Sequence, residues 1–213
     1  MEGVFRFDSK LFRAVEKVVN LIKLNILWIL CSIPIVTGPA ALSALHTTAV
    51  RILENEEGYI FRDFWTVFKS KWKQSLKIGI PLLLVGAGLL FDHLFWKGID
   101  NRFADAMKGF VWVLMGIWLL VVIYIFPLAA RMETTARMAY RNAALLIFKY
   151  LPQSLYLLFI TGIFILAGLL WTPALYVEIL AGGSLLAVVH GKMLVWIFKK
   201  ENMILSEEGS PLS

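Results

Sequence analysis

Ionisable side chains inside apolar segments are the first candidates for chemistry in this 213-residue chain. A charge in lipid is costly, so such a residue carries a functional role by default. Three residues are singled out on this ground, and they are Arg51, Glu178 and His190. Glu178 lies about 8 Å from the predicted outer end of its segment, so its carboxylate is expected to reach water. His46 and His190 lie deeper, where packing is the simplest role, although two imidazoles on separate helices can also ligate haem.

Other signatures of catalysis or cofactor binding are missing from the sequence. It contains no Gly-rich phosphate loop, no zinc-ligand spacing, no serine-centred elbow and no Cys–His pair. The single cysteine, Cys31, lies in an apolar segment and cannot form an internal disulfide. We therefore expect a non-enzymatic protein without a metal or a cofactor.

Long apolar runs must position these side chains. The chain is 59% hydrophobic and 17% charged, with a mean hydropathy of +0.74, whereas about a quarter of the residues of soluble domains are charged. A helix needs about 20 residues to cross a bilayer, and four runs are long enough, at residues 78–96, 109–130, 153–171 and 173–198. The sequence predicts one all-α polytopic membrane domain over residues 1–213.

A fifth apolar region, residues 18–53, is too long for one span and is interrupted by the stretch SIPIVTGPAAL. Its first proline removes a backbone donor and disfavours a helix at the residue before it. The threonine can cap a new helix, the glycine frees the backbone, and the second proline suits a first helical turn. We interpret the stretch as a hairpin apex formed by Pro34, Thr37, Gly38 and Pro39. The returning limb is about 22 Å long as a helix, so the hairpin either crosses the membrane or is re-entrant and shielded by protein.

The distribution of the 21 Lys and Arg residues supports this hairpin. If the chain turns back at the apex, 18 of them lie on one side of the membrane, and the other side holds Lys97, Arg102 and Lys108. A single crossing would place the two most basic segments on opposite sides, against the preference for positive residues in the cytoplasm. We therefore predict a cell-membrane protein with both termini cytoplasmic and a surface-lying arm at residues 1–17. The same topology explains the net charge of +6, and no nucleic-acid partner is expected.

Two cytoplasmic segments are candidate docking surfaces. The first is a predicted amphipathic helix at residues 59–77, with one aromatic face formed by Phe61, Phe64, Trp65, Phe68 and Trp72. Insertion among anionic headgroups is its simpler interpretation, and docking of a partner is the alternative. The second, residues 131–152, is weakly similar to the cytoplasmic docking motif of importer permeases, through the spacing of Glu133, Leu151 and Pro152. Arg137 in the same segment is included as a docking candidate.

The last apolar run carries small residues four positions apart, Gly183, Ala187 and Gly191. In lipid, such a stripe allows another helix to approach closely, so that packing supplies the energy of association. We expect the stripe to pack inside the protein, with contact to a second copy of the chain as the alternative.

Three elements of the sequence resemble the YesL-like family of bacterial integral membrane proteins, a domain-of-unknown-function family numbered 624. They are an Asn-x-x-Trp element at Asn25 and Trp28, the apex prolines with Thr37, and an aromatic element at Phe64, Trp65, Phe68 and Lys69. This family often accompanies carbohydrate importers of the ATP-binding-cassette type, mostly in Gram-positive bacteria. The resemblance therefore implies an accessory or regulatory role beside such an importer, whose permease or ATPase subunit would be the partner.

Two alternatives of other classes stay open. A small transporter or channel would need a hydrated path, for which Arg51, Glu178 and His190 are the candidates. A membrane enzyme acting on lipid or glycan carriers would need convergent polar groups, and spacing alone does not reveal any.

Overall fold

The computed structural model describes residues 4–54, 58–131 and 135–201, and every regular element in these ranges is helical. The helices are α1 (Val4–Ser32), α2 (Gly38–Glu54), α3 (Ile60–Lys97), α4 (Arg102–Arg131), α5 (Ala136–Lys149), α6 (Leu151–Leu170), α7 (Thr172–Val177) and α8 (Gly183–Lys200), with a 3-10 turn η1 (Ile35–Thr37) and a π-helical segment η2 (Glu178–Gly182). Within the same ranges, four helical units are long and apolar enough to cross a membrane, namely α3, α4, α6 and the continuous α7–η2–α8. The predicted all-α polytopic membrane fold is confirmed.

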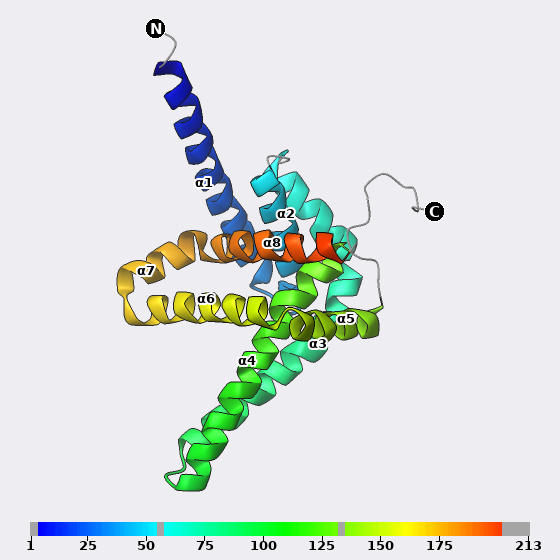
Figure 1. Ribbon diagram of the computed structural model, residues 1–213, viewed down its shortest axis with the longest axis vertical. Coiled ribbons are helices and arrows are strands. Elements are labelled where there is room, and N and C mark those ends of the chain that lie inside the picture. Colours follow the sequence, from blue (N-terminus) through cyan, green and yellow to red (C-terminus); the bar gives the residue numbers. More distant parts are fainter. Residues whose placement is uncertain (1–3, 55–57, 132–134, 202–213) are drawn as a thin grey trace.

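Three arms extend from a common centre (Figure 1). The first half of α1 projects on one side, the hairpin of α3 and α4 projects on the opposite side, and α6 with α7 forms a third arm. At the centre, α2 packs against α1, α3, α4 and α8. The short α2 is therefore the helix around which the longer helices assemble.

The N-terminal arm and the incoming limb of the hairpin form one helix. We expected a surface-lying arm at residues 1–17 followed by a separate limb, but α1 runs without interruption from Val4 to Ser32. The physical reason is that the sequence between these residues contains no proline and no glycine, so nothing in it ends the helix.

The predicted break at the apex is present. Helix α1 ends at Ser32, Pro34 has extended backbone angles (φ −73°, ψ 109°), and α2 begins at Gly38. Thr37 has a different role from the expected one, because its hydroxyl is directed back to the carbonyl oxygens of Cys31 and Pro34. It therefore satisfies the end of α1 rather than the start of α2.

The apex is held against α3 by a proline that packs on a glycine. A Cβ atom placed on Gly79 would lie 2.1 Å from Pro39 Cγ, so only glycine permits this contact. The second proline of the apex thus packs against the middle of the longest helix.

The predicted amphipathic helix at 59–77 and the predicted span at 78–96 are joined in the single helix α3. Pro81 lies inside this helix, where a proline removes one backbone hydrogen bond. Two side chains from other helices donate to α3 carbonyls next to it. The Tyr140 hydroxyl lies 2.5 Å from the Ile78 oxygen, and Trp118 Nε1 lies 2.9 Å from the Leu82 oxygen. These two bonds join α5 and α4 to α3 on either side of Pro81.

Candidate functional site

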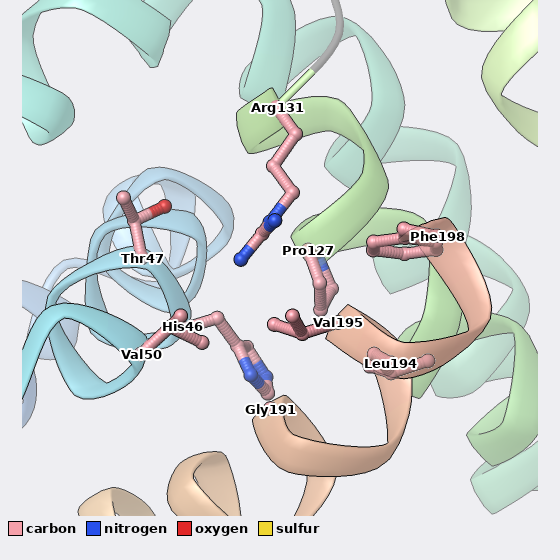
Figure 2. Close-up of a pocket in the computed structure, with 9 residues that line it drawn as sticks. All are labelled: His46, Thr47, Val50, Pro127, Arg131, Gly191, Leu194, Val195 and Phe198. Atoms are coloured by element: carbon pink, nitrogen blue, oxygen red, sulfur yellow. The ribbon is translucent and has the colours of Figure 1, made fainter. Parts of the chain in front are cut away.

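A small cavity lies where α2, α4 and α8 meet, and it is the best candidate for a binding site in the described part of the chain. Its volume is about 10 Å³, which is the space that one water molecule needs. Figure 2 shows the nine residues that line it: His46, Thr47, Val50, Pro127, Arg131, Gly191, Leu194, Val195 and Phe198. Its wall is mostly apolar, with polar groups from α2 and α4 only.

Helical spacing explains why each helix contributes its residues. On α2, His46 and Val50 are one turn apart, as Pro127 and Arg131 are on α4. On α8, Gly191 allows a close approach, because a Cβ atom there would lie 2.8 Å from Val50 Cγ2. The small residue of α8 therefore brings this helix against α2 at the cavity.

Two buried histidines lie beside the cavity, one on α2 and one on α8. The rings of His46 and His190 are nearly parallel, with 15° between their planes and 6.2 Å between their centroids. His190 Nε2 is 3.0 Å from the Thr161 hydroxyl, whose own proton is directed to the Leu157 carbonyl oxygen at 2.7 Å. The Thr161 oxygen therefore accepts, which places the proton of His190 on Nε2. Nε2 of His190 is therefore engaged in a hydrogen bond to α6.

His46 differs from His190 in having an unused ring nitrogen. Its side chain is buried, with 6% exposed, and Nδ1 has no hydrogen-bond partner among the residues that the structure describes. Buried polar atoms are normally bonded to protein or to ordered water. The Nδ1 atom of His46 is thus a polar atom that is enclosed by protein and left without a hydrogen-bond partner by the described residues.

Arg131 supplies the positive charge of the site. It is the last residue of α4, its guanidinium lies 5.9 Å from the centroid of the Phe198 ring, and Figure 2 shows it extending into the space between the three helices. Thr47 also faces the cavity, but its hydroxyl proton is donated to the Ser43 carbonyl oxygen at 3.0 Å. Arg131 is therefore the charged side chain among the nine residues that line the cavity.

The three predicted intramembrane polar residues lie in separate places. Arg51 is paired with Asp63 at 3.6 Å between α2 and α3. Glu178 packs against Gly168 of α6, and its buried Oε1 has no hydrogen-bond partner among the described residues. His190 is three turns further along the last helical unit than Glu178. None of these three residues is bonded to another of the three.

The aromatic docking face at residues 59–77 is divided by the fold. Phe64 and Phe68 are buried against α1 and α2, so they belong to the core and do not form a docking surface. Phe61 is 62% exposed, Trp65 is exposed, and Trp72 is half-buried. The expected docking face is wrong for Phe64 and Phe68, because their rings are buried in the apolar cluster formed with α1 and α2.

The second docking candidate, at residues 131–152, contains the helix α5. One face of α5 is buried against the protein, and its outer face is exposed. Arg137 is exposed on this outer face, whereas Glu133 lies outside the described residues. Ala139, Ala143 and Leu146 are buried against the rest of the protein. This short amphipathic helix connects α4 to α6.

The small-residue stripe of the last helix faces α1 and α2. A Cβ atom on Gly183 would lie 2.5 Å from the ring of Trp28 and 2.8 Å from Asn25 Oδ1. Ala187 is buried in the core around α2, and Gly191 contacts Val50 as described above. All three positions of the stripe lie inside the protein.

Asn25 has a role that the sequence alone did not reveal. Its Nδ2 donates to the Ile179 carbonyl oxygen at 2.9 Å, and its Oδ1 accepts from the Ser184 backbone N–H at 3.1 Å. Residue 179 lies within the π-helical segment η2, and residue 184 follows two residues after its end. A π-helical turn replaces the regular α-helical bonding at this point. One asparagine of α1 thus bridges both backbone groups. An asparagine inside an apolar segment was the available signal, but its partner lies 154 residues away.

A cluster outside the spans ties the end of α8 to the junction of α5 and α6. Glu201 accepts from Lys149 Nζ at 2.7 Å and from the Tyr150 hydroxyl at 2.5 Å. The hydrogen bond from Lys149 holds the pKa of Glu201 below its ordinary value, and the hydrogen bond to Glu201 raises the pKa of Tyr150 to about 12. We refer to Lys149, Tyr150 and Glu201 as the C-terminal latch.

These features define the class of the chain as a polytopic α-helical membrane protein built around a central short helix. Comparison of the sequence with known protein families gives one match. Residues 21–93 match the family described as "Protein of unknown function, DUF624", which confirms the predicted resemblance over this part of the chain. The match includes the asparagine that bridges η2, the apex prolines and the aromatic element of α3. No curated protein and no solved structure matches the chain.

Proposed function

We propose that the protein is a non-enzymatic accessory subunit of a carbohydrate importer of the ATP-binding-cassette type, in the cell membrane of a Gram-positive bacterium and with both termini in the cytoplasm. The class of function follows from the family resemblance. The structural feature that carries the proposal is the outer face of α5, which is the surface through which we expect the partner to bind.

The outer face of α5 combines large apolar side chains with arginines. Phe148 is 75% exposed and Leu145 is 57% exposed, and Met138 lies on the same face two turns before Leu145. Arg137 and Arg141 flank them and are exposed. Aromatic residues, methionine and arginine are enriched in protein–protein interfaces. A short cytoplasmic helix of this kind, anchored by its alanine face, suits binding to the cytoplasmic side of a permease or to its ATPase subunit.

The alternatives would use other parts of the molecule. A channel would need a hydrated path past Arg51, Glu178 and His190, and none of these residues is bonded to another of the three. A membrane enzyme would need convergent reactive groups. The proposal of an accessory subunit requires only an exposed docking face, which α5 offers.

Affinity purification of the full chain in mild detergent, at native expression, tests the proposal. We expect a permease or ATPase subunit of an importer to be recovered with the protein. Recovery of the chain alone, or as a self-oligomer that conducts ions or solutes, would contradict the accessory role.

A pair of matched variants tests the surface separately. Phe148→Ala removes an exposed ring from α5, and Phe159→Ala removes a similarly exposed ring from α6, which is a predicted span. Loss of an aromatic interface anchor typically costs about 2 kcal/mol or more, so Phe148→Ala should reduce recovery of the partner by at least tenfold. Equal recovery with both variants would show that the partner binds elsewhere.

A further inference from the structure

We propose that the basic outer face of α3, around Lys69 and Lys73, binds the headgroup of an anionic phospholipid. This inference does not depend on the importer, and it uses a surface other than the outer face of α5. It concerns a hollow on the outside of the protein. The interior cavity between α2, α4 and α8 has room for one water molecule, so its size excludes a ligand of this kind.

The hollow on α3 is large enough for a headgroup. Its volume is about 440 Å³, which is within the usual range for small-molecule sites. Six residues of this one helix line it, and they are Trp65, Phe68, Lys69, Ser70, Trp72 and Lys73. Phe68 is buried, Trp72 is half-buried, and the other four are exposed. The hollow therefore presents aromatic surface together with two ammonium groups.

The charge at the hollow is positive and is not neutralised by the protein. Lys73 has no hydrogen bond, ion pair or ring contact with any residue that the structure describes. Lys69 Nζ lies 5.3 Å from the centroid of the Trp65 ring, and an uncharged ring leaves the charge of the ammonium uncompensated. Asp63 is the acidic residue in the first half of α3, and its carboxylate is paired with Arg51 at 3.6 Å. The hollow therefore favours an anionic ligand.

The position of the hollow along α3 places its inner end among lipid headgroups. Residues 78–91 contain no charged side chain, so the apolar part of this candidate span begins directly after Lys77. Lys73 is four residues before Lys77, about 6 Å along the helix axis, and the headgroup layer is about 5 to 8 Å thick on each side of the hydrocarbon core. Long lysine side chains near the end of a span extend into this layer. Lys73 is thus at the level of lipid phosphates, and Lys69 is one turn further from the hydrocarbon.

The same face of α3 continues into the membrane as an exposed apolar stripe. Ile80, Leu84 and Phe91 follow Lys73 by seven, eleven and eighteen residues, so all three lie on its side of the helix. Each of them is exposed. A phospholipid has the same order of chemistry, with a charged headgroup followed by apolar chains. A soluble anion would use the lysines alone, so the stripe favours a lipid as the source of the anion.

Lipid binding to the purified full chain in detergent micelles, in phosphate-free buffer, tests the inference. The probes are phosphatidylglycerol, phosphatidylcholine with the same acyl chains, and glycerol phosphate, which is the soluble headgroup. Mass spectrometry of the intact protein counts the bound lipids. We expect phosphatidylglycerol to bind at least tenfold more tightly than phosphatidylcholine, and glycerol phosphate to compete poorly. Equal binding of the two lipids would overturn the proposal. Competition by glycerol phosphate at the concentrations at which phosphatidylglycerol binds would also overturn it, because a soluble anion would then be the ligand.

Two matched lysine variants distinguish this site from general attraction between a basic protein and anionic lipids. Lys73→Gln removes a charge at the hollow, and Lys97→Gln removes the same charge from the other end of the same helix. Both lysines are exposed and directly follow a tryptophan. Lys73→Gln should weaken binding of phosphatidylglycerol roughly tenfold, as loss of a charged hydrogen bond predicts, and Lys97→Gln should leave it unchanged. Lys73→Arg, which keeps the charge, should weaken it less. Equal weakening by Lys73→Gln and Lys97→Gln would overturn the proposal.

A second pair of variants tests the hollow without changing any charge. Ser70→Phe places a ring in the hollow, whereas Thr66→Phe places the same ring on an exposed position of α3 that does not line it. Overlap with the headgroup should make binding of phosphatidylglycerol roughly tenfold weaker in Ser70→Phe, and Thr66→Phe should bind as the wild type does. Thermal unfolding without added lipid checks that both variants are folded. Wild-type affinity in a folded Ser70→Phe would show that the headgroup does not occupy the hollow.

Discussion

The helices α2 and α6 differ in burial, and the more apolar helix is the less buried of the two, which is the reverse of the usual pattern in soluble proteins. Eleven of the 17 residues of α2 are buried, whereas four of the 20 residues of α6 are buried. Yet α6 is rich in leucine, isoleucine and phenylalanine, and α2 is rich in alanine, serine and threonine. The helix with the smaller side chains is at the centre, and the more apolar helix is at the periphery.

The physical reason is that lipid removes the penalty for exposing large apolar side chains. Lipid chains are as apolar as leucine, so helices in a membrane associate through close packing and hydrogen bonds. The alanines of α2 allow four other helices to approach it. Its Ser43 hydroxyl lies 3.1 Å from that of Ser75 on α3. The exposed apolar surface of α6 is thus expected of a lipid-facing helix, and small and polar residues mark the interior.

The strongest test of this comparison is the removal of a polar group from the interior. Asn25→Leu should lower the free energy of unfolding by about 2 to 4 kcal/mol, because the Ile179 carbonyl and the Ser184 N–H both lose their partner and each unsatisfied buried group costs about 1 to 3 kcal/mol. Unfolding in detergent, followed by circular dichroism, measures it. The control Ser184→Ala keeps the backbone N–H and removes a local hydroxyl bond to Ala181, so its effect should be below about 1 kcal/mol. Equal losses of stability in Asn25→Leu and Ser184→Ala would show that the two Asn25 hydrogen bonds stabilise the protein no more than the local Ser184 hydroxyl bond does.

The next test replaces small residues at the centre and at the periphery by the same large one. Gly183→Leu places a side chain where Trp28 and Asn25 lie, and overpacking of this kind costs about 1 to 3 kcal/mol. Gly162→Leu on α6 is the matched control, because a Cβ atom there meets nothing within 4 Å, and its effect should stay within about 0.5 kcal/mol. Thermal unfolding of both variants in detergent decides the matter. If Gly162→Leu is the more harmful variant, α6 has a packed partner that the comparison with α2 omits.

A third test concerns the hydrogen bond that joins α6 to α4. The Tyr124 hydroxyl of α4 and the Ser154 hydroxyl of α6 are buried and 2.8 Å apart. Tyr124→Phe keeps the ring and removes the bond, so unfolding in detergent should become easier by about 0.5 to 1.5 kcal/mol. Tyr156→Phe, at an exposed position of α6, is the control and should have no measurable effect. Identical stabilities of the two variants would mean that the hydrogen bond between Tyr124 and Ser154 does not stabilise the packing of α6 on α4.

Local features of the fold were predictable from the sequence, and contacts between distant segments were not. The four spans follow from their length and hydropathy, and the break near Pro34 follows from the missing backbone donor of proline. The joining of residues 59–77 to the following span was not predicted, because amphipathicity describes a face and says nothing of where a helix ends. Thr37 was assigned to the wrong helix for a related reason, since its hydroxyl can bond to either neighbour.

The candidate site was less predictable than the fold. His46 and His190 stand out in the sequence as intramembrane histidines, but Arg131 falls among the basic residues at the end of a span, where topology alone explains it. The cavity depends on the approach of α8 to α2 at Gly191, which is a contact between segments more than 140 residues apart. A stripe of small residues predicts that some helix approaches closely, but it does not say which one.

The smallest expected effect is a pH dependence of the C-terminal latch, which lies outside the spans and joins the end of α8 to the junction of α5 and α6. Glu201 has a pKa below its ordinary value of 4.5, chiefly through the hydrogen bond from Lys149. A group with a depressed pKa stabilises the folded state above its unfolded pKa and loses this contribution as the pH falls through the folded pKa. The difference in Tm between the wild type and Glu201→Gln should therefore be present near pH 7 and shrink below about pH 4.5.

At alkaline pH the dependence has the opposite sign, because the pKa of Tyr150 is raised to about 12. The contribution of Tyr150 to stability is lost as the pH rises through that value. Tyr150→Phe should remove the alkaline change and keep the acidic one through Lys149. Both groups are close to solvent, so salt should weaken the effect, and an acid-dependent difference that grows in high salt would show that the latch is not what holds α8 to α5 and α6.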